Sequence, residues 1–406
     1  MTGVSPKKKY HNALDVLAHL AVGLYGLACL WLYYQQSITI LPEDKGLVAY
    51  QSDLPLHISM IVEDGWNYSF TAYAYKALYT LFAGNTFGIA LLLAICSIAT
   101  VYVTQQAIRM LYCSQKTIDG SSREEPCDWF TLLLALSLNL VMPIFLEFAG
   151  PYRYISYQSP NIWHNSTYVC MKLFALMTFL YYLKLERKYR DGITSKEWGI
   201  FALLNILTAG IKPSFLLAFS PIMGIFLLVD LFRKVSFKRI LIFGSALLPS
   251  GAVILWQNAV LFGEDTGNAM TFNPWYTFSL HANIPKVVAL LSIGFCGVVI
   301  LAYCKDIKWD KQFLFIILMA ILGFLEALCL VESGARSVDG NFLWGYSFCL
   351  FILFIVTAAK AFMGPCRTAK DKGLKIVLLL IYGWHLHCGI EFYIRLVCGE
   401  SFWMMR

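Results

Sequence analysis

Charged residues are scarce in this sequence. Asp, Glu, Lys and Arg make up 14% of the 406 residues, whereas hydrophobic residues make up 58%. Soluble domains are about one quarter charged, so this composition excludes a soluble fold with a hydrated surface. Apolar runs of about 20 residues, enough to cross roughly 30 Å of hydrocarbon as helix, recur along the chain without the alternation typical of barrel strands. The sequence therefore predicts an all-α polytopic transmembrane helical bundle.

The apolar runs predict about eleven membrane spans in a single integral membrane domain over residues 1–406. The expected spans are 17–34, 86–110, 130–149, 168–185, 198–211, 215–232, 240–262, 287–302, 313–331, 343–362 and 376–397. Most of the 32 lysines and arginines fall in alternate loops, beginning before the first span, and cytoplasmic loops retain basic residues. We therefore expect a cytoplasmic N-terminus in a multi-pass protein of the cell membrane. The net charge of +7 then reflects topology, and no nucleic-acid partner is expected.

Several motifs of soluble chemistry are also missing. The twelve cysteines contain no CxxC pair and fall mostly in predicted helices or inner loops, so neither a zinc site nor a disulfide framework is indicated. The inner loops are short and basic and contain no glycine-rich phosphate loop. The outer segments are longer and mix aromatic with charged residues. The longest is the first extracytoplasmic loop at 35–85, where we expect short interfacial helices and part of a site built from several outer loops.

This first loop contains the string SDLPLHISMIVED. Ser52 and Asp53 can cap a helix whose Pro55 falls in the first turn. If residues 54–63 are helical, Asp53 and His57 lie four residues apart on one face, beside an apolar stripe. Such a helix would lie on the outer leaflet and present an acid and an imidazole to the bundle. The alternative is that Asp53 only caps the helix and that His57 reaches water.

Glu63 and Asp64 follow directly, and Trp66 lies in the turn GWNY. Adjacent carboxylates are more often hydrated loop charges than a catalytic pair. The two acids are therefore second candidates for acid chemistry or for contact with a divalent metal ion, Mg²⁺ or Mn²⁺. Trp66 is a candidate substrate contact.

Three isolated basic residues on the outer side are candidates for binding an anion. Lys212 lies in GIKPS, where Pro213 ends the preceding helix and leaves the lysine at the edge of the hydrocarbon. Arg153 lies in PYRY and Arg336 in ESGARSVDG, both beside residues that suit phosphate binding. Lys212 could instead pair with a carboxylate such as Glu147, with a lipid phosphate or with water, and each arginine with a neighbouring acid.

The layout resembles the C-type glycosyltransferase superfamily (GT-C), multi-spanning enzymes that keep an essential acid in the first outer loop. The matching residue is Asp53 of QSDLPLHISM. The strings SPNIWHNST, AGIKPSF and ESGARSVDGNFLWG also look like bacterial membrane proteins of surface-polysaccharide synthesis. One departure is that Asp53 is followed by Leu54, whereas mannosyl and related transferases carry an adjacent acid pair in this loop.

This resemblance implies an inverting transferase that moves a sugar from a polyprenyl-phosphate lipid to a sugar acceptor at the outer face of the membrane. Asp53 would act as general base toward the acceptor hydroxyl. Lys212, Arg153 and Arg336 would neutralise the departing phosphate. The other expected substrate contacts are His57, Glu63, Asp64, Trp66 and His164.

Two alternatives stay open. A polymerase of polysaccharide repeat units would depend on the outer arginines rather than on the first-loop acid. A transporter or lipid flippase would commonly show broken helices in matching positions of two halves. The sequence predicts one such break, at Lys212 and Pro213.

Overall fold

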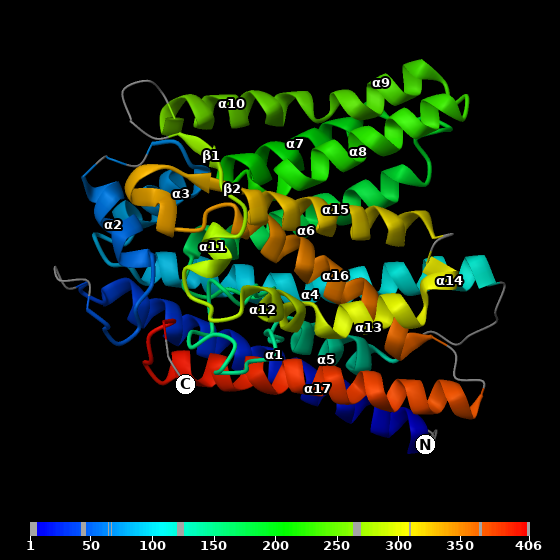
Figure 1. Ribbon diagram of the computed structural model, residues 1–406, viewed down its shortest axis with the longest axis horizontal. Helices are drawn as coiled ribbons and strands as arrows, with labels where there is room; N and C mark the ends of the chain where they lie inside the picture. Colours follow the sequence, from blue (N-terminus) through cyan, green and yellow to red (C-terminus); the bar gives the residue numbers. More distant parts are fainter. Residues whose placement is uncertain are drawn as a thin grey trace, which may run out of the picture.

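The structure of this chain is a computed structural model that describes residues 6–41, 46–63, 65, 67–119, 126–262, 269–307, 310–364 and 368–403. Within these residues the fold is helical apart from one antiparallel two-stranded ribbon. The long helices lie side by side with their axes along the long dimension of the molecule (Figure 1). Seven of them are long and apolar enough to span a membrane, so the expected all-α bundle with several candidate membrane spans is confirmed.

The seven long helices account for most of the predicted spans. They are α1 (Pro6–Ile38), α4 (Phe87–Asp119), α6 (Ser166–Glu186), α8 (Ser214–Phe232), α15 (Lys311–Cys329), α16 (Leu343–Met363) and α17 (Ala369–Val397). Two further apolar helix pairs are bent, α9 (Phe237–Ser245) with α10 (Leu248–Phe262) by 41° and α12 (Pro285–Ser292) with α13 (Gly294–Ala302) by 64°. The described chain therefore has seven candidate spans, or up to nine if each bent pair is one span.

The expected number of about eleven spans is not confirmed, because two apolar runs form shorter helices. The span expected at 130–149 is the 11-residue α5 (Asp128–Leu138), followed by irregular and largely buried chain. The span expected at 198–211 lies in α7 (Ser195–Ile211), which has 17 residues and ends before Lys212, because the residue that precedes Pro213 is kept out of the helical conformation. Apolar composition does not distinguish a spanning helix from irregular chain that is enclosed by protein.

Helix α17 holds the irregular chain that follows α5. The Nδ1 of His385 donates to the carbonyl of Met142 (2.7 Å), and its Nε2 accepts from the backbone N–H of Phe295 (3.2 Å). A Cβ at Gly389 would lie 1.7 Å from the carbonyl oxygen of Leu140, so only glycine permits this close approach. The two hydrogen bonds of His385 pair a backbone carbonyl and a backbone N–H that are buried in the protein.

One end of the bundle carries short elements from several parts of the chain (Figure 1). The short helices expected in the first loop are α2 (Leu54–Val62) and α3 (Phe70–Leu81), and α2 matches the predicted helix at 54–63. Near them lie α11 (Tyr276–Ser279), the 3₁₀ helix η2 (Gly334–Val338) and the ribbon of β1 (Met270–Phe272) and β2 (Leu330–Glu332). The ribbon, in which Met270 pairs with Glu332, was not expected from the sequence.

The central helix α16 is buried on nearly all sides and packs against α4, α8, α13 and α15. Helices α6 and α8 run from the end with the short elements to an ion-pair cluster at the other end, where the short helix α14 (Cys304–Ile307) also lies (Figure 1). There Asp230 of α8 accepts hydrogen bonds from Arg190 (2.9 Å), Lys311 (3.0 Å) and Tyr189. Lys311 also pairs with Glu186 at 2.7 Å. These contacts fix α6, α8 and α15 to one another.

Candidate functional site

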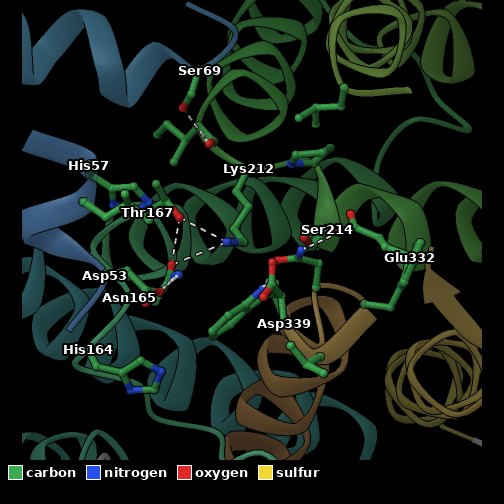
Figure 2. Close-up of a pocket in the computed structure, with 18 of the residues that line it drawn as sticks. Asp53, His57, Ser69, His164, Asn165, Thr167, Lys212, Ser214, Glu332 and Asp339 are labelled. Carbon is green, nitrogen blue, oxygen red and sulfur yellow. Dashed lines mark hydrogen bonds between the residues drawn. The ribbon is translucent and has the colours of Figure 1, made fainter. Parts of the chain in front are cut away.

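A cavity of about 980 Å³ opens at the end of the bundle that carries the short elements. Its walls come from the first loop and α2, the chain before α6, the break between α7 and α8, α10, the chain between β2 and α16, and the residues after α17. Figure 2 shows that side chains from these separate segments point toward one another. Of the residues expected from the sequence, Asp53, His57, His164 and Lys212 line this cavity.

Asp53 directs its carboxylate away from the helix that it precedes. It is the N-cap of α2, yet its side chain makes no capping hydrogen bond, and Ser52 Oγ accepts from the backbone N–H of Leu54 instead (3.3 Å). The Asp53 carboxylate accepts a hydrogen bond of 2.5 Å from Nδ2 of Asn165, and its backbone N–H donates to the carbonyl of His164 (2.9 Å). The alternative that Asp53 only caps the helix is therefore wrong.

The environment of Asp53 also changes its acidity. Burial raises the pKa of the Asp53 carboxyl above its ordinary value, while the hydrogen bond from Asn165 and the charge of Lys212 act in the opposite direction. A carboxylate with a raised pKa is a better proton acceptor near neutral pH than an exposed one.

Asn165 connects this acid to the lysine. It is the N-cap of α6, where its Oδ1 accepts from the backbone N–H of Tyr168 (2.8 Å) and from Thr167 Oγ1 (2.7 Å). The same Oδ1 lies 3.4 Å from Nζ of Lys212, while Nδ2 holds Asp53 (Figure 2). Only 5% of Asn165 is exposed, so this junction is fixed inside the protein.

Lys212 lies at the predicted break between α7 and α8. The residue before a proline is restricted to extended conformations, and Lys212 has φ −162° and ψ 118°. Its Nζ donates to Thr167 Oγ1 (3.1 Å) and lies 4.5 Å from the centre of the Trp344 ring. Among the described residues that line the cavity, Lys212 is the only lysine or arginine.

Three long helices begin at this cavity. The first-turn residues Thr167 of α6, Ser214 of α8 and Trp344 of α16 all line it. A helix N-terminus carries a partial positive charge and free backbone N–H groups. Together with the ammonium of Lys212, these helix ends favour an anion at this part of the wall.

The two histidines expected from the sequence are neutral at pH 7. Burial lowers the pKa of His57 to about 3 and that of His164 to about 3, and the charge of Lys212 adds to both shifts. Nδ1 of His57 lies 2.9 Å from Ser166 Oγ. Each neutral ring has one donor and one acceptor nitrogen, so both can hydrogen-bond but neither adds positive charge.

Three further carboxylates line the cavity, and the sequence did not indicate this group as part of the site. It consists of Glu326, Glu332 and Asp339. Glu332 is 6% exposed and accepts from Nδ2 of Asn341 (2.8 Å), whose Oδ1 accepts from the indole N–H of Trp344 (3.1 Å). Within the described part of the chain no group of three or more His, Cys, Asp and Glu side chains could hold a metal ion.

Other expected site residues are placed elsewhere. Arg153 forms a bidentate ion pair with Glu391 (3.0 and 2.9 Å) and lies over the ring of Phe145, outside the cavity lining. Glu63 is exposed and does not line the cavity either. Asp64 and Trp66 lie outside the described residues. The backbone of Arg336 belongs to η2, but its side chain also lies outside them.

Several residues of the cavity wall were missed from the sequence, above all Asn165, Trp344, Phe402 and Trp403. Asn165 has a local signal, because an asparagine before an apolar run is a common N-cap. The three aromatic residues have no such signal, since aromatic residues are frequent throughout this chain.

Comparisons with known proteins do not assign the chain to a family. No protein-family model matches the sequence, and no curated protein matches it significantly.

Proposed function

We propose that this protein is a membrane glycosyltransferase that moves a sugar from a polyprenyl-phosphate lipid to an acceptor at the outer face of the cell membrane, for a surface polysaccharide or glycoconjugate. The observation that carries this proposal is the Asn165 junction, which contacts the Asp53 carboxylate with one atom and the Lys212 ammonium with another. Such a transferase needs a base beside the acceptor hydroxyl and a cation beside the departing phosphate. Both groups face one cavity here.

Asp53 takes the proton of an acceptor hydroxyl while the hydroxyl oxygen bonds to the anomeric carbon of the donor sugar. The bond from that carbon to the phosphate oxygen breaks, and its electron pair leaves with the phosphate. Attack from the opposite side inverts the configuration. The hydrogen bond from Asn165 orients the carboxylate before substrate binds, and burial raises its pKa toward the pH at which it must accept a proton.

Lys212 stabilises the negative charge that develops on the departing phosphate. Its ammonium lies among the N-termini of α6, α8 and α16, which add partial positive charge without requiring a second cationic side chain. Because these charged and polar groups are held in position before the reaction, they need little reorientation as the bond to the phosphate breaks.

The remaining wall suits a lipid-linked donor. One part of it is aliphatic and includes Leu56, Met60, Ile254, Leu261 and Met270. Leu56 is 53% exposed and Met270 is 55% exposed, so this wall continues to the outer surface of the bundle. An aliphatic wall beside a polar one favours an amphipathic ligand such as a polyprenyl-phosphate sugar over a soluble sugar nucleotide.

The distribution of basic residues supports the orientation that the proposal assumes. Arg190 and Lys311 belong to the ion-pair cluster at the ends of α6 and α8 that lie away from the cavity. Since cytoplasmic segments retain lysine and arginine, we assign the cavity end to the outer face.

The proposal is tested with the full chain in lipid nanodiscs and polyprenyl-phospho-sugars as donors. Asp53→Asn keeps the shape of the side chain but removes the base, and should lower the rate of transfer by about a hundredfold or more. Lys212→Met should lower both the rate and the affinity for polyprenyl phosphate. Asp191→Asn, in an exposed turn between α6 and α7, is the matched control. The assay is repeated with Mg²⁺, with Mn²⁺ and with EDTA to test whether transfer depends on a divalent metal ion. A wild-type rate of transfer by Asp53→Asn would refute the assignment of Asp53 as the base.

A transporter or lipid flippase is the second candidate, and the two bent helix pairs favour it. Broken helices are typical of transporters, in which the substrate site lies between them. Of these two pairs, only α9–α10 contributes residues to the described cavity lining, and α12–α13 contributes none. Movement of polyprenyl phosphate across liposomes with no sugar donor, together with no transfer in the nanodisc assay, would favour this second candidate.

A further inference from the structure

One wall of the cavity is made of aromatic rings that have no role in the transfer step proposed above. This aromatic shelf consists of Tyr154, His164, Phe402 and Trp403, with His281 at its edge, and all five line the cavity. The rings of His164 and Phe402 stack at 4.0 Å with 8° between their planes, and Tyr154 meets His164 edge to face at 4.2 Å. Trp403 lies 5.0 Å from Phe402 and 5.0 Å from His281.

The shelf is attached to the first loop. The backbone N–H of Tyr50 donates to the carbonyl of Gly399 (3.1 Å), and Ser401 Oγ donates to Oε1 of Gln51 (2.7 Å). Gly399 has φ 100°, a conformation that other residues rarely adopt, and a Cβ there would lie 3.2 Å from the Tyr50 ring. The chain after α17 is therefore held in a defined position beside the loop that carries Asp53.

The shelf begins at the residue that supports the proposed base. The carbonyl of His164 accepts the backbone N–H of Asp53 at 2.9 Å, and the ring of the same histidine stacks on Phe402. Lys212 lies against Thr167 and the ring of Trp344, which in turn lies 6.3 Å from the ring of Tyr154 and 6.2 Å from that of His164. In an inverting transfer the acceptor hydroxyl must lie beside the base and the phosphate on the opposite side of the anomeric carbon. The shelf therefore occupies the acceptor side.

The chemistry of the shelf fits a neutral sugar ring. A pyranose presents C–H bonds on its faces, which carry slight positive charge and are attracted to the negative face of an aromatic ring. Its hydroxyl groups need hydrogen-bonding partners, and the imidazoles of His164 and His281 and the side chain of Gln51 also line the cavity. The described lining has no arginine, and its one lysine is not part of the shelf, so the shelf residues themselves do not favour a phosphate.

We infer that the aromatic shelf is the binding site for a neutral saccharide ring of the acceptor, and that Trp403, which remains half-buried, is its principal contact. This inference rests on the proposed function, because it takes Asp53 as the base that defines the acceptor side. It assigns the sugar acceptor, which the resemblance only implied, to a particular wall of the cavity and to Trp403 as its contact.

The inference is tested by saturation-transfer NMR on the full chain in nanodiscs, with a panel of neutral disaccharides (maltose, lactose and N,N′-diacetylchitobiose) as probes. At least one disaccharide should bind the wild type. Trp403→Ala should weaken that binding by about fivefold or more, and Trp403→Phe, which keeps a ring, should recover most of it. Trp384→Ala is the matched control, because Trp384 is 50% exposed on α17 and does not line the cavity.

A second measurement separates this inference from the proposed function. Binding of polyprenyl phosphate should be unchanged in Trp403→Ala and lost in Lys212→Met, whereas disaccharide binding should show the opposite pattern. If no disaccharide binds, or if wild type and Trp403→Ala bind equally well, the inference that the aromatic shelf binds a saccharide is refuted. The proposed binding of polyprenyl phosphate at Lys212 is not affected by that result. Disaccharide binding that needs Trp403, without polyprenyl-phosphate binding or transfer, supports a glycan site and overturns the transferase.

Discussion

Replacement of Asn165 is the most direct test of the junction between Asp53 and Lys212. Asn165→Ala removes the N-cap of α6, which costs about 1 kcal/mol. It also removes the hydrogen bond to the Asp53 carboxylate, and a bond to a charged group contributes about 1.5 to 3 kcal/mol. Because the site is 5% exposed, water cannot readily replace these partners. We expect the free energy of unfolding to fall by about 2.5 to 4 kcal/mol.

Asn165→Asp gives a sharper result because it has the same shape and keeps the cap. The introduced carboxyl would face the Asp53 carboxylate at the present hydrogen-bond distance of 2.5 Å, so the folded protein must hold a proton between them. The folded pKa of this pair is then raised above the unfolded value of about 3.9. The folded state binds more protons than the unfolded state between these two values, so stability is lost as pH rises through the folded pKa.

The measurement is thermal unfolding from pH 5 to pH 8, followed with a dye that reacts with exposed thiols. The buried free cysteines suit this assay and include Cys29, Cys96, Cys170, Cys296, Cys349 and Cys388. Relative to wild type at each pH, Asn165→Asp should be progressively destabilised as pH rises, whereas the deficit of Asn165→Ala should change less. A deficit of Asn165→Asp that does not vary with pH would show that the two side chains are not adjacent.

Two further predictions concern packing. Gly389→Ala should strongly destabilise the protein, because the new methyl group would lie 1.7 Å from the backbone of Leu140. Gly383→Ala on the same helix is the control, because a Cβ there has no described neighbour within 4 Å, and it should be neutral or slightly stabilising. Thermal unfolding of the two variants compares their stability. Arg153→Ala should lower the free energy of unfolding by about 1 to 3 kcal/mol, because it breaks the pair with the partly exposed Glu391. Equal stability of Arg153→Ala and wild type in the same assay would contradict a structural role for this pair.

Part of the site could be predicted from local sequence. The short helix after Asp53 follows from Ser52 and Pro55, and the break at Lys212 follows from Pro213, because both depend on residues next to one another. The position of Arg153 could not be predicted in this way. Its neighbours suited a phosphate, but its partner is Glu391, which is 238 residues away in the sequence.

The apolar composition alone determined that this is a helical protein suited to a membrane, because hydrocarbon leaves no other way to pair the backbone of runs this long. Only the tertiary structure decided which apolar runs form helices long enough to span a membrane, since the chain after α5 is irregular and contacts α17 through His385 and Gly389. It also brought Asp53, Asn165, Lys212 and the rings of Phe402 and Trp403 to one cavity. Contacts between residues so far apart depend on how whole helices pack, and no local pattern in the sequence records that packing.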